Sequence, residues 1–276
     1  MEKQGGQIQR TGGQRFLVIG TGAVLVLGLV FGAALKLEKP GLPADPPAVQ
    51  EILVEQEETL SPEEKLAVIE SGEDYPKKLV LMAKGNPEAI DFVYEYPSRK
   101  GERNQISLLE DMNRDGVPLL MQWDERWGYQ EYGDGPMGYT GCGPTCLSMA
   151  AVYLTGRDKW NPSRVADMAV KEGYMLKNHG SSWTLISEGA EKVGLRAEAL
   201  PLVRGAMVER LNRGELIILA LGPGDFTSSG HFVLVTGYEK DGFHIHDPNR
   251  RSNSEKVWGF SQLKGQIRNL WAVSAL

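Results

Sequence analysis

The sequence predicts an α+β domain in which several helices come first and an antiparallel sheet follows. Helix-capping signals are concentrated between residues 141 and 194, and strand-like apolar runs dominate after residue 216. A separate N-terminal segment precedes this domain, because residues 16–35 contain no charged side chain. Of the 276 residues, 41% are hydrophobic, which excludes a mainly disordered chain. The net charge of -6 argues against nucleic acid as the main partner.

The uncharged run at residues 16–35 is long enough to cross a membrane. At a rise of ~1.5 Å per residue it spans roughly 30 Å, the thickness of the hydrocarbon core. It is longer than the ~7–15 residues usual for a cleaved signal core, which favours an uncleaved transmembrane signal-anchor. Cleavage near the small residues Gly32 and Ala34, with secretion of the rest, is the alternative. Basic residues before the run predict that residues 1–15 are a cytoplasmic tail and that the remainder lies outside the cytoplasmic membrane.

Two further segments separate the predicted anchor from the main domain. Residues 36–59 are rich in proline and glutamate, which is typical of an extended, solvated stalk. Residues 60–104 predict a helical neck, because Ser61-Pro62-Glu63-Glu64 has the form of a capping box and Asn86-Pro87-Glu88 starts a second helix. This segment is too small for an independent core, so we expect either a helical neck or an appendage of the domain at residues 105–276.

Three helices are expected early in the main domain. The first covers residues 143–154 and places Cys146, Met149, Ala150 and Tyr153 on one apolar face. The second runs from Asn161-Pro162 to Gly173, and the third from Ser181-Ser182 to Gly194.

Strands are expected in the second half of the domain. Residues 216–221 are continuously apolar, and residues 267–273 supply a final strand. Residues 232–238 and 243–247 are joined through Asp241-Gly242, which predicts a β-hairpin.

The two cysteines are too few for a disulfide framework or an all-cysteine zinc site. Cys142 lies at the start of the first predicted helix, between two glycines and before Pro144. The positive end of the helix dipole favours a thiolate there, and the backbone N–H of Cys142 is placed to help form an oxyanion hole. Cys146 lies on the core face of the same helix and is interpreted as a buried apolar residue.

A cysteine nucleophile needs a base, and the base needs an orienting group. Of the four histidines, His231 opens a buried strand next to a glycine-rich loop. Asp247 ends the partner strand before Pro248. If Asp247 points at His231, the alternation of side chains turns His246 away. His179 lies in a polar loop, where we expect an exposed residue with no role in catalysis.

These residues resemble the papain-like cysteine peptidases related to the bacteriocin (double-glycine leader) peptidases, in their stand-alone, membrane-anchored bacterial branch. The resemblance covers residues 117–273 and rests on four motifs: Gln122-Trp123-Asp124-Glu125-Arg126-Trp127, Gly141-Cys142-Gly143-Pro144, Gly230-His231-Phe232 and His246-Asp247-Pro248. It implies a papain-like fold, with N-terminal helices packed on an antiparallel sheet. It further implies that Cys142 is the nucleophile, His231 the general base and later the acid, and Asp247 the orienter.

One position departs from the family pattern. Relatives often place an oxyanion-hole glutamine six residues before the nucleophile, where this chain has Pro136. Gln122 either takes that role from a longer spacing or serves in packing. Trp123, Ser182 and Trp183 either line a substrate cleft or pack at its edge.

The implied reaction is hydrolysis of an amide through a thioester, without a cofactor. Because the leader-peptide role belongs to a cytoplasmic domain on an exporter, we expect an extracytoplasmic polypeptide or a cell-wall peptide as substrate. Two alternatives are a zinc site made by Cys142, Cys146, His231 and Asp247, and an inert binding module on the same fold.

Overall fold

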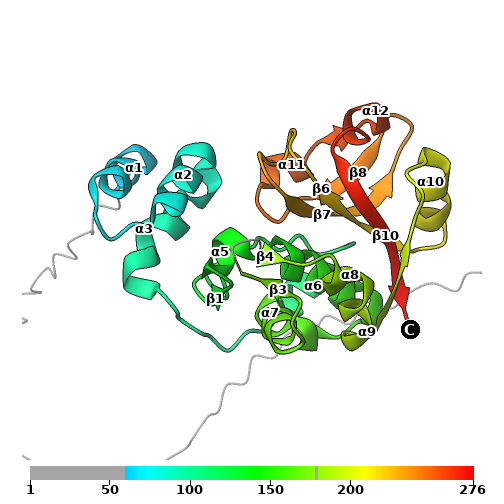
Figure 1. Ribbon diagram of the computed structural model, residues 1–276, viewed down its shortest axis with the longest axis horizontal. Coiled ribbons are helices and arrows are strands. Elements are labelled where there is room, and N and C mark those ends of the chain that lie inside the picture. Colours follow the sequence, from blue (N-terminus) through cyan, green and yellow to red (C-terminus); the bar gives the residue numbers. More distant parts are fainter. Residues whose placement is uncertain (1–59, 178–179) are drawn as a thin grey trace, which may run out of the picture. The chain divides into compact units, whose positions relative to one another are not determined.

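A six-stranded sheet forms the centre of the described chain (Figure 1). The computed structural model describes residues 60–177 and 180–276. The strands follow the order β5-β10-β6-β7-β8-β9, and every neighbouring pair is antiparallel. Their bounds are β5 (Leu195–Ala199), β6 (Leu216–Leu221), β7 (His231–Tyr238), β8 (Phe243–His246), β9 (Val257–Trp258) and β10 (Ile267–Ala275). The predicted class, helices combined with an antiparallel sheet, is therefore confirmed.

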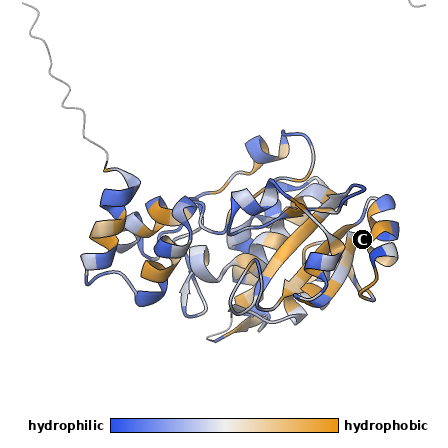
Figure 2. Cartoon of the chain, turned by 90° about the horizontal axis from the view of Figure 1, so that it is seen from above, coloured by the Kyte–Doolittle hydropathy of each residue, from blue (hydrophilic) through white to orange (hydrophobic). Residues whose placement is uncertain are grey.

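Strand β6 is buried along its whole length because both faces of the sheet are covered. Its even-numbered residues belong to one apolar cluster with helix α6 (Cys142–Thr155), and its odd-numbered residues belong to a second cluster with Met207 of α10 (Arg204–Asn212). Figure 2 shows hydrophobic residues gathered in these strands and hydrophilic residues on the outer helices. Burial on both faces explains why residues 216–221 are continuously apolar rather than alternating.

Two of the three predicted helices form as single elements. Helix α6 ends before Gly156, which has the left-handed φ of 65° that favours glycine. Helix α7 (Pro162–Lys171) is capped by the side chain of Asn161, which accepts the N–H of Arg164 at 3.0 Å. Tyr153 is 45% exposed, so the predicted apolar face of α6 ends before it.

The third predicted helix is broken in two, α8 (Thr184–Ser187) and α9 (Gly189–Lys192). Glu188 leaves the helical region with φ at -122°, and Gly189 packs against the ring of Tyr174, where a Cβ atom would lie 3.1 Å from a ring carbon. The remaining elements of the domain are short: α4 (Leu109–Met112), β1 (Glu131–Tyr132), β2 (Gly135–Pro136), α5 (Met137–Thr140), η2 (Asp158–Trp160), β3 (Met175–Leu176), β4 (Gly180–Ser181), α11 (Arg251–Ser254) and α12 (Phe260–Leu263).

The predicted neck consists of three helices that we call the α1–α3 module, residues 62–99. Its elements are α1 (Pro62–Ser71), α2 (Lys77–Gly85), η1 (Pro87–Ala89) and α3 (Ile90–Arg99). Both bonds of the predicted capping box are present between Ser61 and Glu64. The second predicted start is a 3-10 turn, and Asn86 makes no side-chain cap there. Helix α3 contains Pro97 and continues to Arg99.

The α1–α3 module packs against the main domain through aromatic contacts. Phe92 of α3 stacks on Tyr129 with 5.0 Å between ring centroids. Gly138 lies so close to Phe92 that an added Cβ atom would lie 2.3 Å from its ring. Because the module shares a buried cluster with Tyr129, it is an appendage with a common core.

No helix in residues 60–177 and 180–276 combines the length and the apolar character that a membrane crossing needs. The predicted tail, signal-anchor and stalk, at residues 1–15, 16–35 and 36–59, lie outside the described residues.

Candidate active site

Cys142 is the first residue of α6, and its side chain is partly exposed at the wall of a cleft. Both neighbours of Cys142 are glycines, because neither position leaves room for a Cβ atom. A Cβ atom on Gly141 would lie 2.5 Å from the carbonyl oxygen of Met137, and one on Gly143 would lie 2.6 Å from Oγ of Ser181. The first turn of α6 is therefore pressed against its neighbours, which fixes the direction of the thiol.

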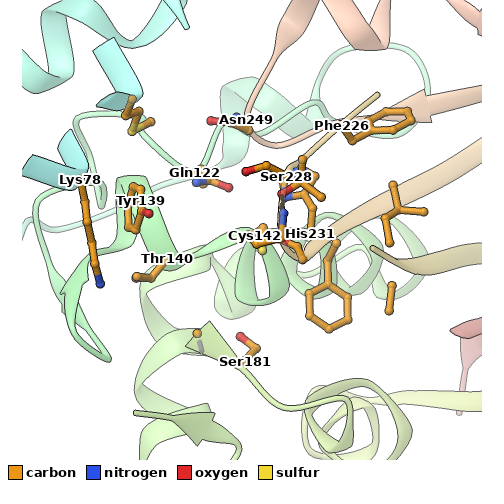
Figure 3. A pocket seen from close by; sticks show the side chains of 18 of the residues that line it. Lys78, Gln122, Tyr139, Thr140, Cys142, Ser181, Phe226, Ser228, His231 and Asn249 are labelled. Carbon is orange, nitrogen blue, oxygen red and sulfur yellow. Dashed lines mark hydrogen bonds between the residues drawn. The ribbon is translucent and has the colours of Figure 1, made fainter. Parts of the chain in front are cut away.

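The thiol of Cys142 interacts with the imidazole of His231, which lines the same cleft. Burial alone raises the pKa of a thiol. At Cys142 the hydrogen bond and the charge of His231, together with backbone N–H groups of Phe232 and Gly143, outweigh burial and hold the pKa below its ordinary value of 9.0. Figure 3 shows Cys142 and His231 together, with Gln122 and Ser181 on either side of them in this view. The arrangement favours a thiolate beside an imidazolium.

His231 is the first residue of β7, and Asp247 directly follows β8 at the same end of the hairpin. Nε2 of His231 lies 2.7 Å from Oδ1 of Asp247. Because Nε2 faces the carboxylate, Nδ1 is the ring nitrogen that remains for the thiol. Burial lowers the pKa of an imidazole, but the charge of Asp247 and its hydrogen bond outweigh this and raise the pKa of His231 well above 6.5.

Asp247 is completely buried, and both carboxylate oxygens and its backbone N–H have hydrogen-bond partners. Oδ1 also accepts the N–H of Asn249 at 2.8 Å, and Oδ2 accepts Nδ2 of Asn253 at 2.7 Å. Its own N–H donates to Oγ of Ser254 at 2.9 Å. Burial raises the pKa of a carboxyl group, but the charge and hydrogen bond of His231 and the donors of Asn253 and Asn249 hold the pKa of Asp247 below its ordinary value.

Cys146 is fully buried one turn after Cys142. Its pKa is raised well above 9.0 by burial and then by the nearby charges of Cys142 and Asp247. As the sequence predicts, Cys146 fills the core below α6.

Gln122 lines the cleft close to Cys142 and is 4% exposed. Its Nε2 donates to the carbonyl oxygen of Gly138 at 2.9 Å, while its Oε1 is buried without a hydrogen-bond partner. Its backbone N–H donates to the carbonyl oxygen of Pro248 at 2.8 Å, which ties Gln122 to the segment after Asp247. Pro136, the residue at the usual position of an oxyanion-hole glutamine, lies in β2 and accepts a hydrogen bond from Thr140 through its carbonyl oxygen.

The cleft has a volume of about 1040 Å³ and is lined by segments from several parts of the fold. Ser182 and Trp183 are among its lining residues, and Trp183 is 48% exposed there. Ser182 also accepts the N–H of Thr184 at the start of α8. Trp123 does not line the cleft. Its indole N–H instead donates to the carbonyl oxygen of Asn249 at 2.9 Å, so its observed contact is with the loop after Asp247.

The other histidines have different surroundings. His244 is half-exposed, with Nε2 3.8 Å from Oε2 of Glu239. Burial lowers the pKa of His246 to about 4, although its ring hydrogen-bonds to the backbone of Pro118. Neither lines the cleft, in agreement with the predicted alternation around Asp247. His179 lies outside the described residues. Within residues 60–177 and 180–276, no three His, Cys, Asp or Glu side chains are grouped so that they could hold a metal ion.

A family model, Peptidase_C39 like family, matches residues 114–274, which is more than half of the chain. The protein belongs to the Peptidase_C39 like family. The matched range includes the predicted residues 117–273, so the predicted membership in a peptidase family of this type is confirmed. Membership in the Peptidase_C39 like family supports a cysteine peptidase function.

Three solved structures are similar to this chain at low identity. The peptidase domain of Streptococcus ComA, a bi-functional ABC transporter involved in a quorum sensing pathway, has 17% identity and a TM-score of 0.39, covering 50% of this chain and 93% of that one. A C39-like peptidase from Bacillus anthracis has 15% identity and a TM-score of 0.35, covering 56% and 94%. A double glycine motif protease from an AMS/PCAT transporter, in complex with the leader peptide, has 19% identity and a TM-score of 0.36, covering 59% and 94%. No curated protein matches the chain.

Two groups of residues at this Peptidase_C39-like site were not predicted. Asn253 binds Asp247 from a polar stretch whose composition gives no signal for the contact. Helix α2 also lines the cleft, through Lys78, Leu81 and Met82, although it lies outside the matched range. The two helix starts predicted in the neck, at residues 61–64 and 86–88, do not include this helix.

Proposed function

We propose that this protein is a membrane-anchored, extracytoplasmic cysteine peptidase that hydrolyses an amide bond through Cys142, His231 and Asp247. One observation carries the proposal: a continuous series of interactions runs from buried Asp247 through His231 to Cys142, at the first residue of a long helix. The series ends at a cleft large enough for a segment of polypeptide. Membership in the Peptidase_C39 like family supports the same chemistry.

In the acylation step, the thiolate sulfur of Cys142 attacks the carbonyl carbon of the scissile amide. The C–N bond breaks as Nδ1 of the imidazolium of His231 gives its proton to the leaving amine. Asp247 holds the ring through Nε2, which keeps Nδ1 directed at the reacting atoms. The products of this step are a free amine and a thioester on Cys142.

In the deacylation step, water attacks the thioester carbonyl while neutral His231 accepts its proton. The C–S bond then breaks, a carboxylic acid leaves, and the thiolate returns beside the imidazolium. Oxyanion stabilisation is assigned to the backbone N–H of Cys142 and to Gln122. The second N–H of the Gln122 amide is available for this purpose, because only one bond from Nε2 is made to Gly138.

The proposed location follows from the sequence of the N-terminal segment. A signal-anchor at residues 16–35, preceded by basic residues, would place the cleft outside the cytoplasmic membrane. The substrate class proposed for that location is a polypeptide or a peptide of the cell wall. The exposed side chains that line the cleft include two aromatic residues, Tyr139 and Trp183, and the hydroxyl of Ser228. This mixture suits an extended peptide with varied side chains.

The nucleophile is tested by iodoacetamide labelling of the full-length chain between pH 6 and 8, with the adduct mapped by mass spectrometry. We expect Cys142 to label at least ~10-fold faster than a free thiol control, because its pKa is lowered. Labelling of Cys142 no faster than that of Cys146 would exclude it as the nucleophile. Incubation with peptide libraries, using Cys142→Ala as the control, then identifies the cleaved sequence.

The location is tested by protease accessibility in intact cells and in inverted membrane vesicles. The proposal expects the domain at residues 105–276 to be digested only when added protease reaches the outer face of the membrane. Digestion only in inverted vesicles would place the domain in the cytoplasm. Recovery of the domain in the medium would indicate cleavage of the N-terminal segment.

A further inference from the structure

The turn between α2 and α3 binds the short helix α11 that follows Asp247. Oε2 of Glu88 accepts the N–H of Arg251 at 2.7 Å, and Oε1 accepts the N–H of Ser252 at 3.1 Å. Burial raises the pKa of a carboxyl group, but the hydrogen bonds from Ser252 and Arg251 hold the pKa of Glu88 below its ordinary value. Glu88 therefore satisfies two of the N–H groups that the first turn of a helix leaves without partners.

The same turn also holds the residues just before α11. Nδ2 of Asn86 donates to the carbonyl oxygen of Asn249 at 2.8 Å, the same oxygen that accepts the indole N–H of Trp123. The side chain of Arg250 donates to the carbonyl oxygen of Gly85. Residues 249–252 are thus bound at several points by residues 85–88, which are distant in the sequence.

Helix α11 in turn supplies two of the groups that fix Asp247. Asn253 donates to Oδ2 of the carboxylate, and Ser254 accepts the backbone N–H of Asp247. If the first turn of α11 moves, both contacts move with it. A chain of direct contacts therefore leads from Glu88 through α11 to Asp247 and on to His231.

We infer that Glu88, assisted by Asn86, is a positioning residue for His231, and that the α1–α3 module completes the active site from outside the family-matched residues. The inference rests on the proposed function only in so far as His231 is the base of the proposed triad. Glu88 touches no reacting atom and acts through α11 and Asp247. The same module lines the cleft through α2, so one appendage both forms a wall of the site and orients its base.

A purely structural role for Glu88 can be separated from positioning. Docking of the module is also provided by the packing of Phe92 on Tyr129 and Gly138. Removal of Glu88 should leave the module in place while loosening residues 249–254. The matched control is Glu70, an acidic residue of the same module whose carboxylate pairs with Lys84 of α2 at 2.7 Å.

The test measures the pKa of His231 by NMR titration of the full-length chain with isotope-labelled histidine, for the wild type and for Glu88→Ala, Glu88→Gln and Glu70→Ala. We expect the pKa of His231 to fall by roughly 0.5–1 unit in Glu88→Ala, because Asp247 is held less firmly against the ring. Glu88→Gln keeps an acceptor oxygen and should shift the pKa in the same direction by less. It also provides the measurement if Glu88→Ala does not fold. Glu70→Ala should leave the pKa unchanged.

Alkylation of Cys142, measured on the same proteins, separates this inference from the proposed function. An unchanged pKa of His231 in both Glu88 variants, with fast alkylation of wild-type Cys142, overturns the positioning role and leaves the peptidase proposal standing. A lowered pKa with an unreactive wild-type Cys142 supports the positioning role and overturns the peptidase proposal. An equal shift in Glu70→Ala overturns the positioning role, because the effect would then follow from any disturbance of the module.

Discussion

Two sites one turn apart on α6 contain the same side chain and have opposite properties. Cys142 is partly exposed at the first residue of the helix, and its pKa is lowered by His231 and backbone N–H groups. Cys146 is fully buried, and its pKa is raised well above the ordinary value by burial and by the charges of Cys142 and Asp247. The comparison teaches that the helix end and the hydrogen-bonding partner set the chemistry of a thiol, and that residue type alone does not.

The strongest test of this contrast removes each sulfur in turn. Cys142→Ala should reduce kcat/KM by ~10⁴-fold or more, because no other group at the site can form the thioester. Cys146→Ala should change kcat/KM by no more than about twofold, since its sulfur only fills the core. Peptidase activity of both variants is measured on the same cleaved peptide. Comparable losses in the two variants would contradict the division of roles.

Neutralising Asp247 should reduce the reactivity of the Cys142 thiol and leave the buried Cys146 thiol unreactive. Asp247→Asn removes the charge that stabilises the imidazolium of His231, and kcat should fall by ~10²–10⁴-fold. Alkylation of Cys142 at pH 7 should slow as well, while Cys146 stays protected by burial. Stopped-flow alkylation together with peptidase assays checks this. Unchanged alkylation of Cys142 would mean that Asp247 does not act on the thiol through His231.

The side chain of Gln122 is the second proposed oxyanion donor, after the backbone N–H of Cys142. If it acts in this way, Gln122→Ala should reduce kcat by ~10–10³-fold with little change in KM. The melting temperature is measured alongside, because a packing role would lower stability and leave the activity of the folded fraction intact. A loss of stability without a loss of activity would leave the backbone N–H of Cys142 as the remaining assigned oxyanion donor.

The pH dependence of Cys142 alkylation sharpens the comparison between the two thiols. The lowered pKa of Cys142 predicts an acidic limb below 9.0, where protonation of the thiolate reduces the rate about tenfold per unit of pH. The raised pKa of His231 predicts that the imidazolium persists well above 6.5 and is lost only on an alkaline limb. Peptide hydrolysis should therefore be fastest between the two limbs. A profile that follows an ordinary thiol, with no plateau, would contradict an ion pair.

Cys146→Ala, which should have the smallest effect on activity, should have a measurable effect on stability. Cys146→Ala leaves a small cavity among fully buried neighbours and should lower the free energy of unfolding by about 1–2 kcal/mol. Cys142→Ala, at a partly exposed position, should change it by less. Urea denaturation of both variants measures the difference. A larger loss of stability for Cys142→Ala would place that residue in the core.

Much of the domain follows from local signals in the sequence. The continuous apolar run at residues 216–221 and the Asp241-Gly242 turn predict β6 and the β7–β8 hairpin because burial and turn chemistry act over a few residues. Helix α6 follows from its flanking glycines and Pro144. The pairing of His231 with Asp247 also follows, since both lie at one end of a hairpin with known side-chain alternation.

The rest of the site depends on contacts between segments that lie far apart in the chain. Nothing in the sequence near Asn86 or Glu88 indicates that they bind residues 249–252, because the two segments lie 163 residues apart and meet only in the folded protein. For the same reason Trp123, expected as a possible cleft residue, binds the carbonyl of Asn249. The break between α8 and α9 lies where Gly189 packs against Tyr174, a tertiary contact that helix propensity does not include.

The hairpin β7–β8 brings the proposed base and its carboxylate together, whereas the proposed nucleophile comes from a helix much earlier in the chain. His231 and Asp247 can come together as soon as the turn of the β7–β8 hairpin closes. The thiol of Cys142 gains its low pKa only when α6 docks onto β7. An unfolded chain therefore carries an ordinary, slowly reacting cysteine. The proposed peptidase activity would appear only after the two halves of the domain have met.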